Sequence, residues 1–206
     1  MITVYGSAQS RSFRALWALE ESSLNYNYQP VRIGRRGENG TKSDSYKQLN
    51  PQGKVPSLQD DDFVVNESIA ILNYIAALSP QANLMPLHDI KLRAYYDEVC
   101  SFVVSELEQA LWTAAKHRFL IPKEFRVVDI SGAVEWEFSR AVTALESYID
   151  NKEFVVGDTF TMADILISHT LAWAEAAKFK IPTHLLDYKN KHTQRTAFHR
   201  AIIAES

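Results

Sequence analysis

The spacing of apolar residues changes near residue 80, and this change limits the possible folds more than any other feature of the sequence. Residues 1–78 alternate short apolar stretches with stretches of helical spacing. Beyond residue 87 the apolar residues recur at helical spacing over long segments. We therefore expect an α/β domain over residues 1–78, a linker over 79–87 and an all-helical domain over 88–206.

The first part of the chain predicts the element order strand, helix, strand, long loop, hairpin, helix. An apolar strand is expected at residues 2–5, and Ser10 and Ser12 precede the first helix as candidate caps of its open amides. A second strand is expected around residues 26–33. The polar stretch at residues 34–50 predicts a long loop with one short helical turn, and long loops in compact domains are often functional.

A hairpin and a helix complete this first domain. The apolar segments at residues 55–58 and 63–65 bracket Gln59-Asp60-Asp61-Asp62, a run typical of a turn. The next helix is expected to open at residues 66–68 and to carry its apolar residues on one face. A unit of this order and length has roughly the size of a thioredoxin domain.

The second part of the chain contains three long stretches of helical spacing. Their apolar stripes run through residues 92–111, 133–149 and 165–173. Thr161-Met162-Ala163-Asp164 precedes the third stripe and is similar to a capping box, with Asp in place of the usual Glu or Gln. We assign Thr161 and Asp164 to the stability of the fold and not to catalysis.

Composition excludes several classes of function. The net charge of −3 comes without any basic excess, which argues against binding to nucleic acid or to an anionic membrane. The single cysteine, Cys100, lies among apolar residues, so we expect a buried structural thiol. The start of the chain lacks the basic head and apolar stretch of a signal peptide, and no apolar segment is long enough to span a bilayer. These features predict a soluble cytoplasmic protein.

The six histidines show no metal-binding spacing. We expect no metal site, and four of these histidines are expected at the surface, namely His88, His184, His192 and His199.

Four motifs occur in a fixed order along the chain. They are Tyr5-Gly6-Ser7-Ala8-Gln9-Ser10-Arg11-Ser12-Phe13-Arg14, Asn50-Pro51-Gln52-Gly53-Lys54-Val55-Pro56-Ser57-Leu58, Glu67-Ser68-Ile69-Ala70-Ile71-Leu72-Asn73-Tyr74-Ile75 and Phe154-Val155-Val156-Gly157-Asp158-Thr159-Phe160-Thr161-Met162-Ala163-Asp164. Together they resemble the cytosolic glutathione transferases, in particular their serine-type, theta-like and bacterial branch. The resemblance covers nearly the whole chain.

The resemblance implies both a fold and an activity. The fold is a thioredoxin-like α/β domain followed by an all-helical bundle domain. The implied activity is a glutathione S-transferase reaction, in which the thiol of glutathione is activated to attack an electrophilic, apolar second substrate. Glutathione is then a co-substrate, no metal takes part, and the protein forms a homodimer with Glu67 and Ser68 close to the subunit interface.

Ser10 is the candidate catalytic residue, because the resemblance aligns it with the catalytic serine of theta-like members. A free thiol has a pKa of about 8.5, so little of it is thiolate near neutral pH. A hydroxyl at a helix N-terminus can stabilise the thiolate through a charge-assisted hydrogen bond and the helix dipole. Three other hydroxyls remain alternatives, those of Ser7, Ser12 and Tyr5. Arg11 and Arg14 could add positive charge, although exposed helix surface is the expected place for Arg14.

The second and third motifs supply the candidate glutathione-binding residues. In thioredoxin-like folds the bond corresponding to Val55-Pro56 is cis, and it presents the backbone of Val55 to an extended peptide, much as a strand adds to a sheet edge. Ser68, at a helix start, can take the α-carboxylate of the γ-glutamyl group, and Glu67 can pair with its ammonium. Lys54 faces the glycyl carboxylate by resemblance, and Lys42 is a weaker candidate for the same role.

Residues of the helical domain are the candidates for the second-substrate pocket. Trp112, Lys116 and Phe119 follow the first long stripe, and aromatic side chains suit an apolar electrophile. Core packing is the alternative role of such aromatic residues, and we prefer it for Trp173.

Two other functions remain open. Transferase-like folds also serve as interaction modules or ligand carriers, because a fold does not determine a function. Glutathione-dependent isomerases and peroxidases share the same site. Zeta-type isomerases carry a Ser-Ser-Cys run near the first helix, where this chain has Gln9-Ser10-Arg11, and this weakens the isomerase hypothesis. No site cysteine is present for thiol–disulfide exchange.

Overall fold

A computed structural model describes residues 1–206, which form two compact units. Unit 1 contains residues 1–87 and 194–206, and unit 2 contains residues 88–193. The helical domain expected over residues 88–206 therefore differs from unit 2 at its end, because the last helix packs in unit 1.

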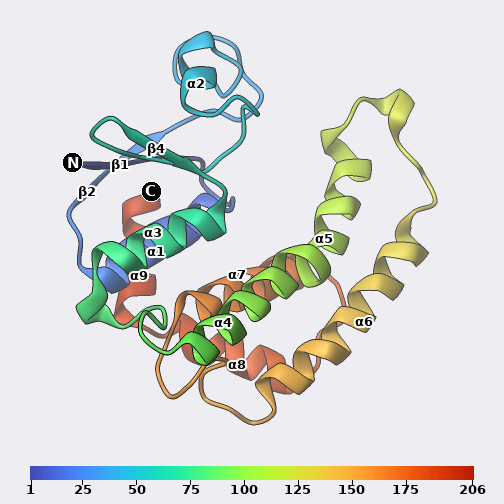
Figure 1. Ribbon diagram of the computed structural model, residues 1–206. Helices are drawn as coiled ribbons and strands as arrows, with labels where there is room; N and C mark the ends of the chain where they lie inside the picture. Colours follow the sequence, from blue (N-terminus) through green and yellow to red (C-terminus); the bar gives the residue numbers. More distant parts are fainter. The chain divides into compact units, whose positions relative to one another are not determined.

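Unit 1 is built on a mixed four-stranded sheet of order β2-β1-β3-β4 (Figure 1). The strands are β1 (Ile2–Gly6), β2 (Tyr26–Pro30), β3 (Ser57–Asp60) and β4 (Phe63–Asn66). β1 runs parallel to β2 and antiparallel to β3, and β3 forms the expected hairpin with β4. Tyr5 pairs with Ser57, and Ser57 pairs with Asn66. The end of β1, the start of β3 and the end of β4 therefore meet at one end of the sheet.

Three helices of unit 1 lie on the same side of the sheet (Figure 1). They are α1 (Ser12–Ser22), α3 (Ser68–Leu78) and α9 (Thr196–Glu205). The short α2 (Asp44–Leu49) lies in the long loop, as the one helical turn expected there. Ser43 caps α2 by accepting a hydrogen bond from the Tyr46 amide.

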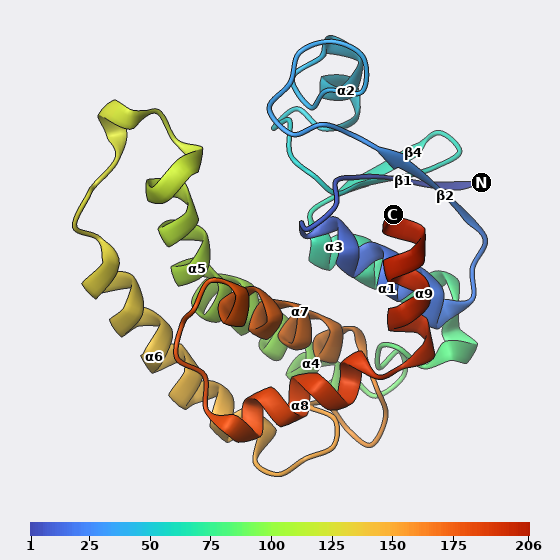
Figure 2. The ribbon, with the colours of Figure 1, turned by 180° about the vertical axis from the view of Figure 1, so that it is seen from behind.

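The return of α9 to unit 1 has a clear physical basis in its contacts with α1 (Figure 2). The ring of Phe198 packs edge-on against Trp17, with a centroid distance of 4.9 Å. Arg195 forms a two-pronged ion pair with Glu21, at 2.6 and 2.8 Å, and the Glu21 side chain is only 8% exposed. Arg200 donates one hydrogen bond to the Glu20 carboxylate and a second to the Glu20 backbone carbonyl.

Replacing Arg195 with methionine should lower the free energy of unfolding by about 2 kcal/mol, because a largely buried Glu21 carboxylate loses its bidentate cation. Urea unfolding measures this change. Lys191→Met is the matched control, since the Lys191–Glu153 pair is exposed on both sides and should contribute less than about 1 kcal/mol. Equal losses in the two variants would contradict the role given to Arg195.

Unit 2 is entirely helical (Figure 1). The stripe expected over residues 92–111 forms α4 (Ile90–Phe102), a π-helical segment (Val103–Leu107) and α5 (Glu108–Ala115), followed by a second π-helical segment (Lys116–Leu120). α6 (Ser131–Ile149) packs along α5, and α7 (Met162–Ala176) contacts α4, α5 and α8 (Thr183–Thr193). No helix is both long and apolar enough to cross a bilayer.

The capping box at the start of α7 is present as expected. The buried carboxylate of Asp164 accepts hydrogen bonds from the Thr161 amide at 2.7 Å, the Thr161 hydroxyl at 2.9 Å and the Val155 amide at 2.9 Å. The hydroxyl of Tyr188 donates a further one. Burial raises the pKa of the Asp164 carboxyl, and these four donors oppose the rise. Asp164 thus ties together the loop before α7, α7 itself and α8.

Two residues of unit 2 test the expectations drawn from composition. Cys100 is buried, which confirms the expected buried thiol, and this burial raises the pKa of the thiol to about 12. The expectation for His192 is wrong, because its side chain is 1% exposed. Its ring packs against the rings of Phe154, Phe160 and Tyr188, and these aromatic contacts surround the buried side chain.

Candidate functional site

The loop between β1 and α1 carries Ser10 at the N-terminus of the helix. The Ser10 hydroxyl oxygen accepts a hydrogen bond from the amide of Ser12, the first residue of α1, at 3.1 Å. The same oxygen lies 2.6 Å from the Ser7 carbonyl and 2.9 Å from the Ser12 hydroxyl. A hydroxyl has one proton, so Ser10 can donate to only one partner at a time. Its proton must leave the Ser7 carbonyl before it can serve a sulfur atom.

The alternative hydroxyls differ from Ser10 in exposure and in partners. Ser12 is fully buried and accepts a hydrogen bond from the Ser7 amide. The Tyr5 hydroxyl donates to the Gln59 side chain at 2.9 Å. Ser10 and Ser7 are both half-buried. These contacts favour Ser10 and Ser7 over the other two as partners of a ligand.

Gln9, next to Ser10, has a left-handed backbone with φ of 56°. Its amide lies 3.4 Å from the carboxylate of Glu205, so the last turn of α9 contacts the loop that carries Ser10. Burial raises the pKa of the Glu205 carboxyl. The end of α9 thus supports the loop geometry.

The bond between Val55 and Pro56 is cis, as expected from the resemblance. The carbonyl of the preceding Lys54 points inward, where it accepts hydrogen bonds from the Tyr46 hydroxyl at 2.7 Å and the Asn50 amide group at 3.0 Å. Burial raises the pKa of the Tyr46 hydroxyl, so this phenol keeps the proton that it donates. No hydrogen bond within the chain uses the amide or the carbonyl of Val55, which leaves both groups able to pair with an extended peptide.

A network of side-chain hydrogen bonds holds this loop to the hairpin. The Ser57 hydroxyl donates to the Asn66 side chain at 2.7 Å, and Asn66 donates to the Leu49 carbonyl at 2.9 Å. Gln52 donates to the Glu67 carboxylate at 3.1 Å. The Asn66–Leu49 and Gln52–Glu67 hydrogen bonds join the loop to β4 and to the start of α3, and the Ser57–Asn66 bond joins β3 to β4, so the loop that carries residues 54–56 is held to the hairpin.

Glu67 and Ser68 form the start of α3 at the end of β4. Glu67 is exposed and has a positive φ of 67°, an unusual conformation for a residue other than glycine. Ser68 is the first helical residue and is 8% exposed. Lys54 and Lys42 are exposed on the adjacent loops.

Arg14 corrects the expectation of exposed helix surface, because its side chain is completely buried. Its Nη1 atom donates a hydrogen bond to the Ser68 hydroxyl at 3.2 Å. Since an arginine is buried only with polar partners, this contact connects α1 to the start of α3. Arg11 is half-exposed.

The three residues predicted for the second-substrate pocket lie on one continuous helical stretch. Trp112 lies on α5, and Lys116 and Phe119 follow at spacings of four and three residues on the π-helical segment. Trp112 and Lys116 are half-buried, and Phe119 is 61% exposed.

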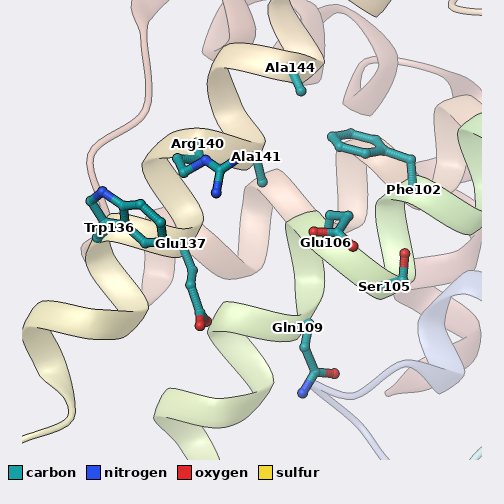
Figure 3. A pocket seen from close by; sticks show the side chains of 9 residues that line it. All are labelled: Phe102, Ser105, Glu106, Gln109, Trp136, Glu137, Arg140, Ala141 and Ala144. Carbon is teal, nitrogen blue, oxygen red and sulfur yellow. The ribbon is translucent and has the colours of Figure 1, made fainter.

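Unit 2 also has a groove of about 500 Å³ between the α4–α5 stretch and α6 (Figure 3). Trp136 and Arg140 form one wall, with the guanidinium 5.0 Å from the ring centroid, and Phe102 lies opposite. None of the three predicted second-substrate residues lines this groove.

Sequence reasoning missed the residues that support the site from behind. Gln52, Asn50 and Tyr46 were not singled out, although Asn50 and Gln52 lie within the second motif. Their roles depend on contacts between the loop and the hairpin. A buried arginine cannot be told from an exposed one by its position in a helix, so no pattern in the sequence indicated Arg14. No group of three or more His, Cys, Asp and Glu side chains is placed to bind a metal.

Comparison with known proteins identifies the family. Residues 1–77 match the model of the glutathione S-transferase N-terminal domain, and residues 109–205 match that of the C-terminal domain. Glutathione S-transferase Z1 of Arabidopsis thaliana is 32% identical over 77% of this chain and 70% of its own length. "Probable maleylacetoacetate isomerase 1" of Drosophila melanogaster is 28% identical over 77% of this chain and 62% of its own length.

A solved glutathione S-transferase structure is similar to this chain over a larger share of its length. A sphingomonad glutathione S-transferase complexed with glutathione is 26% identical, covers 98% of each chain and has a TM-score of 0.83. A theta-class transferase of Rattus norvegicus and a transferase of Escherichia coli are also among the relatives. This chain therefore belongs to the glutathione S-transferase family, and the predicted thioredoxin-like and all-helical domains are confirmed.

Proposed function

We propose that this protein activates the thiol of glutathione for attack on an electrophilic, apolar second substrate. The observation that carries this proposal is the meeting of three segments at one end of the sheet. The strand register brings the end of β1, the cis bond before β3 and the start of α3 together. In this proposal one extended tripeptide contacts the Ser10 hydroxyl, the backbone of Val55 and the N-terminus of α3.

Each part of glutathione has a partner in this proposal. The cysteinyl backbone pairs with the amide and carbonyl of Val55, next to Pro56. The α-carboxylate of the γ-glutamyl group binds Ser68 at the start of α3, and its ammonium pairs with Glu67. Lys54 binds the glycyl carboxylate. Positioning by these contacts supplies part of the rate enhancement.

Ser10 stabilises the sulfur anion by donating its hydroxyl proton in a hydrogen bond. The thiol proton passes to solvent, the thiolate forms a carbon–sulfur bond, and the leaving group departs with the electron pair of its own bond. Lowering the thiol pKa by about 2 units requires roughly 2.7 kcal/mol of differential stabilisation. A charge-assisted hydrogen bond together with the dipole of α1 can supply this amount.

Trp112, Lys116 and Phe119 contact the second substrate in this proposal. Their place on one continuous helical stretch and their incomplete burial support it. We also propose that the protein acts as a homodimer in the cytoplasm. Size-exclusion chromatography with light scattering tests the dimer directly.

Retention on glutathione-agarose, together with turnover of a model aryl halide, tests the proposed function. We expect specific elution by free glutathione and a rate that depends on both substrates. Elution without turnover of any electrophile would instead favour a binding module. Failure to bind glutathione at all would contradict the proposed site.

Glutathione-dependent isomerisation is the second candidate function, favoured by the similarity to the Drosophila protein. In that reaction the thiolate adds to a conjugated double bond, a single bond rotates, and elimination restores both the double bond and the thiol. Glutathione is then not consumed, whereas a transferase consumes one molecule for each product. Measuring free thiol during turnover of a cis-configured conjugated diketo acid separates the two activities.

A further inference from the structure

Arg14 is the most unusual charged residue of unit 1, because it is 0% exposed and lies in the first turn of α1. Its Nη1 atom reaches across to α3 and donates to the Ser68 hydroxyl at 3.2 Å. Ser68 is itself the first residue of α3. The guanidinium therefore lies close to the N-terminus of α3.

This position is electrostatically unfavourable for a cation on its own. Each helix N-terminus carries a partial positive charge, which favours anions and opposes cations. A buried guanidinium adds a full positive charge to the same region. The combined field favours an anion at the start of α3, and Ser68 is the hydroxyl on which the guanidinium acts.

The contact also determines how the Ser68 hydroxyl is oriented. Arginine is a donor only, so the Ser68 oxygen must accept in this hydrogen bond. The single proton of Ser68 is then directed away from Arg14 and remains available to an acceptor. A neighbouring cation also strengthens the hydroxyl as a donor, because hydrogen bonds in a chain polarise one another.

We propose that Arg14 is a positioning residue that selects for the α-carboxylate of the γ-glutamyl group by acting through Ser68. This inference rests on the proposed function, because it concerns the same glutathione site. Arg14 does not contact the reacting sulfur in this proposal. It sets the preference of the site for the α-carboxylate of the ligand.

A glutathione analogue that lacks only this carboxylate provides the test. The tripeptide 4-aminobutanoyl-cysteinyl-glycine keeps the amine, the thiol and the glycyl carboxylate. Isothermal titration calorimetry measures Kd for both peptides with wild type, Arg14→Met, Arg14→Lys, Ser68→Ala and the Arg14→Met/Ser68→Ala double variant. Arg93→Met is the matched control, because Arg93 is partly exposed and pairs with Asp97 on the surface of α4.

Wild type and Arg93→Met should bind glutathione at least about tenfold more tightly than the analogue, as expected for a hydrogen bond to a charged group. Arg14→Met should reduce this preference to less than about threefold, with the Kd of the analogue changed by less than about twofold. Arg14→Lys should keep part of the preference, because it keeps the charge without the planar fork. The double variant should lose no more of the preference for glutathione over the analogue than Ser68→Ala loses alone.

A purely structural role for Arg14 predicts a different pattern. Loss of packing between α1 and α3 would weaken the binding of both peptides equally and leave their ratio unchanged, which would overturn the inference. Additive losses in the double variant would overturn it as well. Near-ultraviolet circular dichroism shows whether Arg14→Met folds. If it does not, the ratio of the two Kd values in Arg14→Lys is the deciding measurement, and a ratio equal to that of wild type overturns the inference.

The design separates this inference from the proposed function. A wild-type protein that binds neither peptide refutes the glutathione site and the inference with it. A wild-type protein that prefers glutathione, while the Arg14 variants keep the full preference, refutes only the role of Arg14.

Discussion

Replacing Ser10 with alanine is expected to lower kcat for conjugation about 100-fold near pH 6.5, while KM for glutathione changes by less than about twofold. The reason is that the hydroxyl stabilises the thiolate and contributes little to holding the tripeptide, which is bound by the backbone of Val55 and by the start of α3. Stopped-flow measurement of the rate against pH gives the more direct result. The wild-type profile should rise with an apparent pKa about 2 units below that of Ser10→Ala, and the two rates should approach each other above about pH 8.5.

Two control variants separate catalysis from the structural role of Ser10. Its hydroxyl oxygen also accepts the hydrogen bond of the Ser12 amide, so alanine should cost about 1 kcal/mol of stability. Ser10→Thr keeps a hydroxyl at the same place and should restore most of the rate. Ser7→Ala should leave the pH profile unchanged. If Ser7→Ala shifts the profile and Ser10→Ala does not, the catalytic assignment passes to Ser7.

Replacing Asp164 with alanine is expected to lower the free energy of unfolding by about 3–5 kcal/mol, the largest stability effect predicted for this chain. The change leaves four buried donors from Val155, Thr161 and Tyr188 without an acceptor. Differential scanning calorimetry should show a decrease in Tm of roughly 6–20 °C.

Asp158 provides the matched control for this substitution, because it lies in the loop before α7 and is exposed. Asp158→Ala should change the free energy of unfolding by less than about 0.5 kcal/mol. Asp164→Asn keeps the shape of the side chain and turns an amide donor toward other donors, so it should still be clearly destabilising. A Tm for Asp164→Asn within 2 °C of wild type, by the same scaling, would show that the carboxylate charge and its acceptor geometry contribute little.

Much of the candidate site could be predicted because its main-chain parts are short and local in sequence. Ser10 follows a strand and precedes a helix, and Val55-Pro56 precedes a hairpin strand, so each position follows from its neighbours in the chain. The register of β1, β3 and β4 then brings these segments together. The support behind them could not be predicted in the same way, because Tyr46, Asn50 and Gln52 act through contacts with distant residues.

Local patterns in the sequence were sufficient for the element types and for the capping box of Thr161 and Asp164, because these depend on spacing and on motifs of a few residues, whereas the cis bond was expected from the resemblance to a known family. Only the tertiary structure decided that α9 returns to unit 1, that His192 is buried among aromatic rings and that Arg14 lies beneath Ser68. Burial and pairing over long sequence separations are set by which surfaces meet. A pattern along one helix does not contain that information, because an aromatic, a histidine or an arginine suits both a surface and a specific buried contact.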